Sequence, residues 1–216
     1  MVRFRLAPHR ARLNCGSMDP NFSLDPRRPG QQREVTAQNH SAKFPVVTPL
    51  AGTAVSLDSV PDPILATGTI GAGVAVIPDA GVEVVQILAP IGGVMKRVAP
   101  NMFVIQTQPA PGGLPQKPGA HADDFHAEML ADQPSIFMQL GVDTGRLNGQ
   151  GFDVHVQEGD LVRQGTPVCT YAPRELGRMG FDPVVMVLGL QMGASEIKLD
   201  VFSGEPVMGG DNLFWV

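Results

Sequence analysis

Short apolar runs, each ended by Pro or Gly, recur along the chain from Phe44 onward. They are rich in Val, Ile and Phe, which favour extended backbone, and they are too short for packed helices. Many short strands at this spacing predict an all-β fold, a compact antiparallel sandwich or barrel. The predicted strands are Pro45–Val47, Gly73–Ile77, Val82–Leu88, Met102–Ile105, Ser135–Leu140, Phe152–Val156, Pro167–Thr170, Pro183–Val187 and Leu213–Val216.

One segment departs from the strand pattern, and one pattern occurs twice. Arg174–Met179 is the best candidate for a short helical turn, so the sequence predicts one or two such turns in all. Pro49–Leu57 and Pro90–Val98 share the order Pro, aliphatic, any residue, Gly, four residues, aliphatic. Two copies of one hairpin unit indicate a barrel built by duplication.

Composition excludes several classes of protein. With 25 Gly and 20 Pro among 216 residues, and only 17% charged residues, the chain is not a helical bundle or coiled coil. Its apolar stretches, such as Val184–Leu190, are well short of the roughly 18–20 residues that a membrane span needs. Cys15 and Cys169 are too few for a disulfide scaffold or a Cys-based zinc site. We therefore expect a soluble cytoplasmic domain without a membrane span.

Charge is distributed unevenly between the two ends of the chain. Residues 1–44 carry eight basic and three acidic side chains, whereas the remainder carries eight basic and 18 acidic ones. The first segment also lacks apolar periodicity, so it cannot bury enough surface to order itself. We predict a disordered basic tail over 1–43 and one domain over 44–216. A weak peripheral contact of this tail with acidic lipid is the alternative to a plain flexible leader. We expect no nucleic-acid partner.

Several motifs follow one another in a fixed order through residues 44–216. They are Val60–Ala66, Gly71–Ala75, Ala89–Gly93, Leu140–Thr144, Leu147–Phe152, Glu158–Gly165, Asp182–Val185 and the closing stretch Phe214–Val216. Together they resemble the glucose-type enzyme IIA of the bacterial phosphoenolpyruvate-dependent sugar phosphotransferase system.

The resemblance implies a duplicated hybrid β-sandwich or barrel that carries phosphoryl groups in the cytoplasm. A carrier of this type takes phosphate from the histidine phosphocarrier protein and passes it to a sugar-specific IIB domain of a IIB/IIC permease. Its unphosphorylated form also binds transporters and metabolic enzymes. The resemblance places the partner-docking surface at Val74, Phe103, Phe137 and Asp143.

This chain departs from the family pattern at the two histidines that carry and support the phosphoryl group. The acceptor position holds Gln139 and the supporting position holds Asn101. Amide nitrogens are poor nucleophiles because their lone pairs are delocalised into the carbonyl group. We therefore predict a degenerate site and a docking or regulatory module with impaired phosphocarrier chemistry. The interpretation that both residues are merely drifted surface positions stays open.

Other histidines offer an alternative acceptor. His121 and His126 lie in a Pro- and Gly-rich insertion at about 109–133, beside acidic residues that would repel phosphate. An active phosphoryl-transfer protein using an acceptor such as His126 is the alternative hypothesis. His155 is expected to be an ordinary surface residue of a strand. We predict no metal and no cofactor. A structural relic or an interaction domain unrelated to sugar uptake is the third hypothesis.

Overall fold

The computed structural model describes residues 44–62, 64, 67–108 and 133–216. The chain divides into two units, Met1–His40 and Ser41–Val216, and every described residue belongs to the second. The predicted tail at 1–43 lies outside the described residues, as does nearly all of the insertion at 109–133. Both stay predictions.

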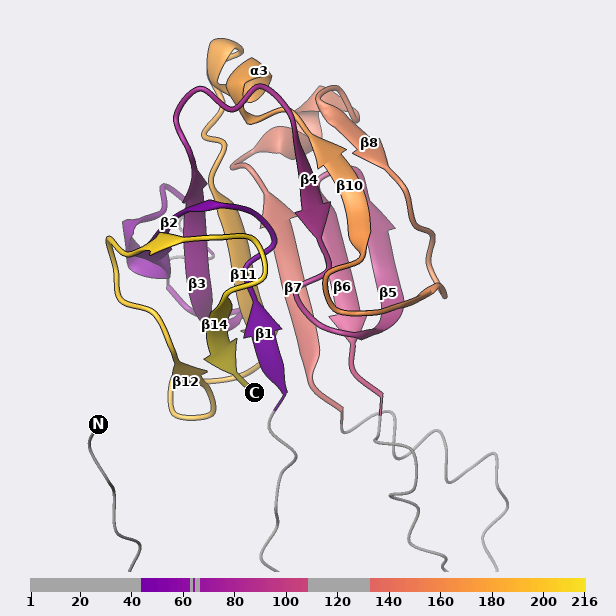
Figure 1. Ribbon diagram of the computed structural model, residues 1–216, viewed down its shortest axis with the longest axis vertical. Helices are drawn as coiled ribbons and strands as arrows, with labels where there is room; N and C mark the ends of the chain where they lie inside the picture. Colours follow the sequence, from indigo (N-terminus) through magenta and orange to yellow (C-terminus); the bar gives the residue numbers. More distant parts are fainter. Residues whose placement is uncertain (1–43, 63, 65–66, 109–132) are drawn as a thin grey trace, which may run out of the picture. The chain divides into compact units, whose positions relative to one another are not determined.

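In the described residues, antiparallel strands dominate, which confirms the predicted all-β class (Figure 1). The strands are β1 (Pro45–Val47), β2 (Gly52–Ser56), β3 (Gly71–Pro78), β4 (Val85–Leu88), β5 (Gly93–Ala99), β6 (Met102–Gln106), β7 (Ser135–Leu140), β8 (Phe152–Val154), β9 (Leu161–Val162), β10 (Pro167–Tyr171), β11 (Val185–Leu190), β12 (Lys198–Leu199), β13 (Pro206–Val207) and β14 (Asn212–Trp215). The helical segments are the 3-10 turns η1 (Leu57–Ser59) and η2 (Thr144–Leu147) and the short helix α3 (Pro173–Arg178).

The strands form three sheets around one main core. The largest has eight strands in the order β13-β2-β3-β11-β7-β6-β5-β9, and the two smaller ones have the orders β1-β14-β12 and β4-β10-β8. In Figure 1 strands of the smaller sheets cross in front of the large one. Side chains from all three sheets meet in one buried apolar cluster, for example Met138 of β7, Phe214 of β14 and Ile87 of β4. The architecture is therefore a sandwich, as the strand pattern predicts.

The internal repeat in the sequence corresponds to a repeat in the structure. Gly52 of β2 pairs with Val207 of β13, and Gly93 of β5 pairs with Val162 of β9. The strands β2 and β5 each lead into a central hairpin partner, β3 and β6 respectively. The two halves of the large sheet, β13-β2-β3-β11 and β9-β5-β6-β7, therefore have the same pairing scheme. This agrees with the duplication that the sequence indicates.

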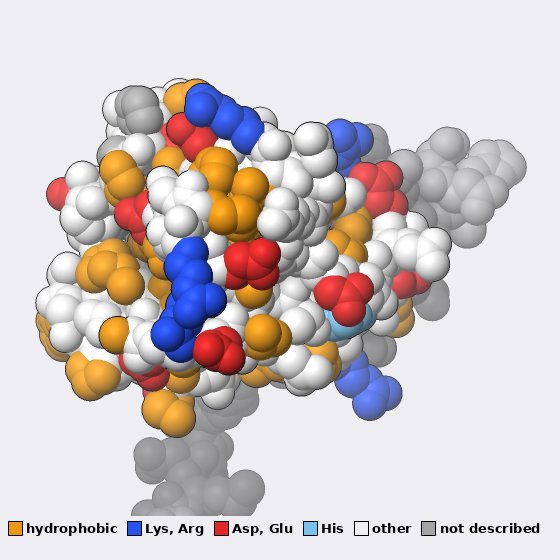
Figure 2. Space-filling view, turned by 90° about the horizontal axis from the view of Figure 1, so that it is seen from above, with side chains coloured by type: hydrophobic (Ala, Val, Ile, Leu, Met, Phe, Trp, Pro, Cys, Tyr) orange, Lys and Arg blue, Asp and Glu red, His pale blue; other side chains and the backbone are white. Residues whose placement is uncertain are grey.

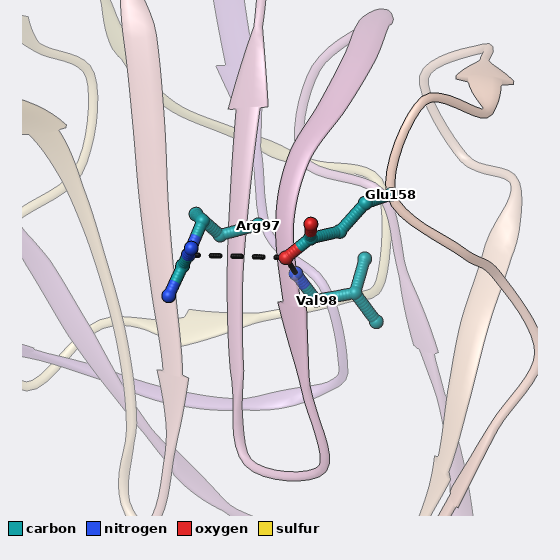
Figure 3. Close-up of polar contacts among 3 residues, drawn as sticks. All are labelled: Arg97, Val98 and Glu158. Atoms are coloured by element: carbon teal, nitrogen blue, oxygen red, sulfur yellow. Dashed lines mark hydrogen bonds and ion pairs between the residues drawn. The ribbon is translucent and has the colours of Figure 1, made fainter.

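A side chain stabilises the irregular part of β5. The register of β5 against β6 shifts between Met95 and Arg97, so Lys96 is an extra, exposed residue at a bulge. Beyond the bulge, the backbone N–H of Val98 donates to Glu158 Oε1 at 3.3 Å, and Arg97 Nε lies 3.8 Å from the same oxygen (Figure 3). Because this ion pair is exposed, it adds little stability beyond satisfying that N–H.

The predicted elements agree with the structure best where they are long and buried. Ser135–Leu140 has the bounds of β7, and the predicted helical turn is α3, shifted by one residue. The strand predicted from Pro183 begins instead at Val185, because Asp182 Oδ1 accepts the N–H of Val184 at 3.0 Å and holds the chain in a turn.

Candidate functional site

Asn101, in the turn before β6, lies beside Gln139 of the neighbouring strand β7. Gln139 of β7 is paired with Met102 of β6, the residue directly after Asn101. The backbone carbonyl of Asn101 accepts the N–H of Leu140 at 2.8 Å. Both side chains are partly exposed. The two positions that the sequence marks as vacated histidines therefore form one site at the end of the β6–β7 ladder.

Thr144 connects the two amides to the backbone. Its hydroxyl is buried and donates to the carbonyl of Leu140 at 2.7 Å, while Asn101 Nδ2 donates to the same hydroxyl oxygen at 3.0 Å. Gln139 Nε2 donates to the carbonyl of Gly141 at 3.2 Å. Both amide groups are thus held by donation toward the turn that follows β7. Nothing in the sequence near Thr144 reveals this role, because its hydroxyl contacts a residue 43 positions away.

Thr144→Val tests this network because it keeps the shape of the side chain and removes the hydroxyl. We expect a loss of about 1–3 kcal/mol in the free energy of unfolding, the usual range for a buried hydrogen-bonding group that loses its partner. The side-chain NH₂ resonances of Asn101 should also move. Urea denaturation and NMR measure the two effects.

Thr53→Val is the matched control, because Thr53 lies on β2 and its hydroxyl makes no hydrogen bond to another described residue. We expect it to stay within about 0.5 kcal/mol of the parent. An equal loss in both variants would contradict the role given to Thr144.

Two of the residues predicted to form the docking surface are buried in the core. Val74 and Phe103 are 4% and 0% exposed, and both point into the main core. They are therefore wrong as docking residues. Phe137 does lie on the outer face of the large sheet, although it is only 8% exposed.

The physical reason for this error is strand alternation. Side chains along a strand point to opposite faces, so the residues that share a face with Gln139 are its pairing partner Met102 and the next residue of that parity, Val104. Both are partly exposed, and both pack against the outer cluster, as does Val142. Alternate positions counted from Gln139 give Phe137, and the register of β6 on β7 then places Met102 and Val104 on the same face.

Asp143 lies beside the pair at the start of η2. Its side chain is exposed, and its carboxylate Oδ2 lies 3.7 Å from Arg146 Nη2. Its φ of 58° is in the left-handed region, which Asp tolerates better than most residues. The charged group nearest in sequence to Gln139 is therefore already in an exposed ion pair, and Asp143 remains accessible to a partner.

No histidine or cysteine side chain lies at this site among the described residues. His155 follows β8, in a different sheet, and its Nε2 contacts Thr170 Oγ1 at 2.8 Å. Burial raises the pKa of the Cys169 thiol to about 12, so Cys169 stays protonated and unreactive. His121 and His126 lie outside the described residues.

Metal-ligand clusters and membrane-spanning helices are both absent from the described part of the chain. Nowhere in it do three or more His, Cys, Asp or Glu side chains gather as metal ligands would. None of its helices has the length and apolar character to cross a membrane.

The chain is similar to components of one bacterial uptake system. The family model for the phosphoenolpyruvate-dependent sugar phosphotransferase system, EIIA 1, matches residues 44–112 and 120–194. The PTS system glucose-specific EIIA component of Oceanobacillus iheyensis is 33% identical over 126 residues, which are 58% of this chain and 61% of that protein. The mannose-specific EIIBCA component of Corynebacterium glutamicum is 35% identical over 126 residues, 58% of this chain but 15% of that protein.

A solved structure is similar in fold. Glucose permease IIA from Mycoplasma capricolum superposes with a TM-score of 0.60 at 20% sequence identity, over 80% of this chain and 95% of that one. At this identity the likeness supports the predicted fold. The chain thus spans less than two thirds of the length of the curated relatives described above, and only a small part of the fused one.

Proposed function

Because this chain belongs to the EIIA 1 family of the phosphoenolpyruvate-dependent sugar phosphotransferase system, we propose that it is a docking or regulatory component of that system with impaired phosphocarrier chemistry. The observation that carries the proposal is the pair Asn101 and Gln139, which occupies one site at the end of the β6–β7 ladder with no imidazole among the described residues around it.

The chemistry of a carboxamide explains the impairment. To receive a phosphoryl group, a nitrogen must direct a lone pair at phosphorus while the bond to the donor nitrogen breaks. A neutral imidazole has such a lone pair in the plane of its ring. The lone pair of an amide nitrogen is delocalised into its carbonyl group, as in the peptide bond. In addition, the NH₂ groups of Asn101 and Gln139 are already engaged as donors to Thr144 and Gly141.

The proposed partners are the histidine phosphocarrier protein and a IIB/IIC permease, or transporters that the system regulates, in the cytoplasm. Relatives named EIIBCA and EIICBA carry an EIIA domain in one chain with B and C components, which supports partners of this kind. The surface proposed for docking comprises Met102, Val104 and Val142 around the pair, with Phe137 behind them and Asp143 at the margin. Figure 2 views the α3 end of the molecule, where acidic and basic side chains are interspersed with apolar ones.

The test is incubation of the chain with phosphoenolpyruvate, enzyme I and the histidine phosphocarrier, followed by intact-mass spectrometry at neutral pH. We expect the chain to show no mass increase corresponding to a phosphoryl group, while the phosphocarrier itself is labelled. Without phosphoenolpyruvate, the unphosphorylated phosphocarrier should co-purify with the chain. Label that maps to His121 or His126 would contradict the proposal and establish the alternative acceptor.

A further inference from the structure

We infer that the site of Asn101 and Gln139 distinguishes the two states of a partner histidine: it binds the partner when its imidazole is unphosphorylated and disfavours the phosphorylated form. The inference rests on the proposed docking function and adds to it a preference that comes from the polarity of the two amides.

The polarity of the Asn101 amide is fixed by a chain of hydrogen bonds that ends on the backbone. The Leu140 carbonyl can only accept, so the Thr144 hydroxyl donates its proton to it, at 2.7 Å. The hydroxyl oxygen can then only accept from Asn101, and it meets the NH₂ group at 3.0 Å. A reversed amide would place its carbonyl oxygen against the lone pairs of that hydroxyl.

The polarity of the Gln139 amide is fixed in the same way. Its NH₂ group lies 3.2 Å from the Gly141 carbonyl oxygen. A reversed amide would bring two carbonyl oxygens together, with one hydrogen bond lost. Both side chains therefore donate inward to acceptors that cannot change their role.

The two amide carbonyl oxygens are left facing outward. Neither accepts a hydrogen bond from another described residue, and no buried side-chain nitrogen or oxygen in the described part of the chain lacks a partner. Since Asn101 and Gln139 are both partly exposed, their carbonyl oxygens reach solvent. The site thus presents two acceptors to whatever docks on it.

These acceptors lie on an apolar face, which strengthens their effect. Met102 and Val142 flank the pair, and hydrogen bonds and charge interactions are stronger next to apolar surface than in water. An unphosphorylated imidazole brings an N–H donor that such an oxygen can accept. A phosphoryl group brings about −1.5 to −2 charges and only acceptor oxygens near neutral pH, and it would meet the negative ends of two dipoles.

The nearest basic side chain does not remove this penalty. Arg146 lies in η2, is exposed, and already faces the Asp143 carboxylate at 3.7 Å. A phosphoryl group approaching the pair would have to compete with that carboxylate for Arg146. The geometry therefore favours a partner that donates a proton over one that brings negative charge.

The experiment compares the affinity of the full chain for the two forms of the histidine phosphocarrier protein. The ¹⁵N-labelled chain is titrated by NMR with the unphosphorylated protein, and with the same protein held phosphorylated by catalytic enzyme I and excess phosphoenolpyruvate. We expect the unphosphorylated form to bind at least about tenfold more tightly, the effect of one unmet charge-assisted hydrogen bond.

Two variants test whether the amide oxygens cause the preference. Gln139→Leu removes one of them and Asn101→Ala removes the other, and each should lower the preference to about threefold or less. Gln106→Leu makes the same exchange as the first variant on β6, away from the pair, and should leave the preference at the parent value. Circular dichroism and thermal unfolding verify that each variant keeps its fold.

The outcomes separate the inference from the function on which it rests. If both forms bind equally, or the phosphorylated form binds more tightly, the inference is overturned and docking stands. If neither form binds, or the chain takes up the phosphoryl group, the proposed function fails and the inference with it. A preference that survives unchanged in Gln139→Leu and Asn101→Ala also overturns the inference.

Discussion

Introducing histidine at both amide positions, Asn101→His with Gln139→His, is expected to make the chain a phosphoryl acceptor. An imidazole at position 139 can donate through Nδ1–H to the Gly141 carbonyl, as Gln139 Nε2 does now. That tautomer leaves the lone pair of Nε2 free to attack phosphorus as the nitrogen–phosphorus bond of the donor breaks. We expect the transfer rate to rise by at least about a thousandfold, since removing a nucleophile from an active site costs more than this. Rapid-quench labelling from the phosphorylated phosphocarrier measures the rate.

The control for this experiment is Gln106→His, which adds an imidazole to β6 away from the site. It should stay unlabelled. Of the two single variants, Gln139→His should accept phosphate more slowly than the double variant. Asn101→His should accept little, because the family resemblance assigns position 101 the supporting role. A folded double variant that takes up no phosphate would show that the two amides are not what prevents transfer.

Gly93→Ala is expected to destabilise the fold strongly. A Cβ at Gly93 would lie 2.0 Å from the carbonyl oxygen of Gln106 and 2.7 Å from its carbon, both backbone atoms of the paired strand β6. Only a shift of β5 relative to β6 can relieve such a contact. We expect a loss of about 3 kcal/mol or more in the free energy of unfolding, and hence a fall of about 6–12 °C in Tm for a domain of this size.

The repeat contains a second glycine equivalent to Gly93, and a glycine of η2 serves as the control. Gly52→Ala should cost a similar amount, because its Cβ would lie 2.1 Å from the carbonyl oxygen of Ile77. Gly145→Ala should change stability by no more than about 0.5 kcal/mol, since nothing lies within 4 Å of its Cβ and its φ is not in the left-handed region. If Gly93→Ala left the free energy of unfolding unchanged, the close approach of the two strands would be contradicted. Urea denaturation measures the free energy of unfolding of each variant.

The sequence predicts much of the fold because the apolar runs of strands, and the Pro and Gly residues that end them, are local signals. Ser135–Leu140 agrees with β7 residue for residue, since a buried strand bounded by Pro134 and Gly141 needs no other information. The two-residue strands β9, β12 and β13 exist only through pairing with distant partners. No stretch of two residues has a period to detect.

The candidate site likewise has features that the sequence predicts and features that it does not. The ordered motifs locate Asn101 and Gln139, and their adjacency follows from the hairpin-like pairing of β6 with β7. The assignment of Phe103 to the surface failed because the sequence leaves open which face of β6 is outermost when both faces are apolar. The role of Thr144 depends on a contact between distant segments, which no local pattern contains.

The way Asn101 and Gln139 bond to the turn after β7 also bears on how chains of this kind are recognised. The amide nitrogen of Gln139 donates to the Gly141 carbonyl. A ring nitrogen of histidine could make the same hydrogen bond, so the backbone conformation does not depend on which of the two residues is present. Under the proposed function, the fold is therefore retained through an exchange that removes reactivity, and membership in the family describes the architecture of the chain. The ability to carry a phosphoryl group depends on the side-chain nitrogen atoms at positions 101 and 139.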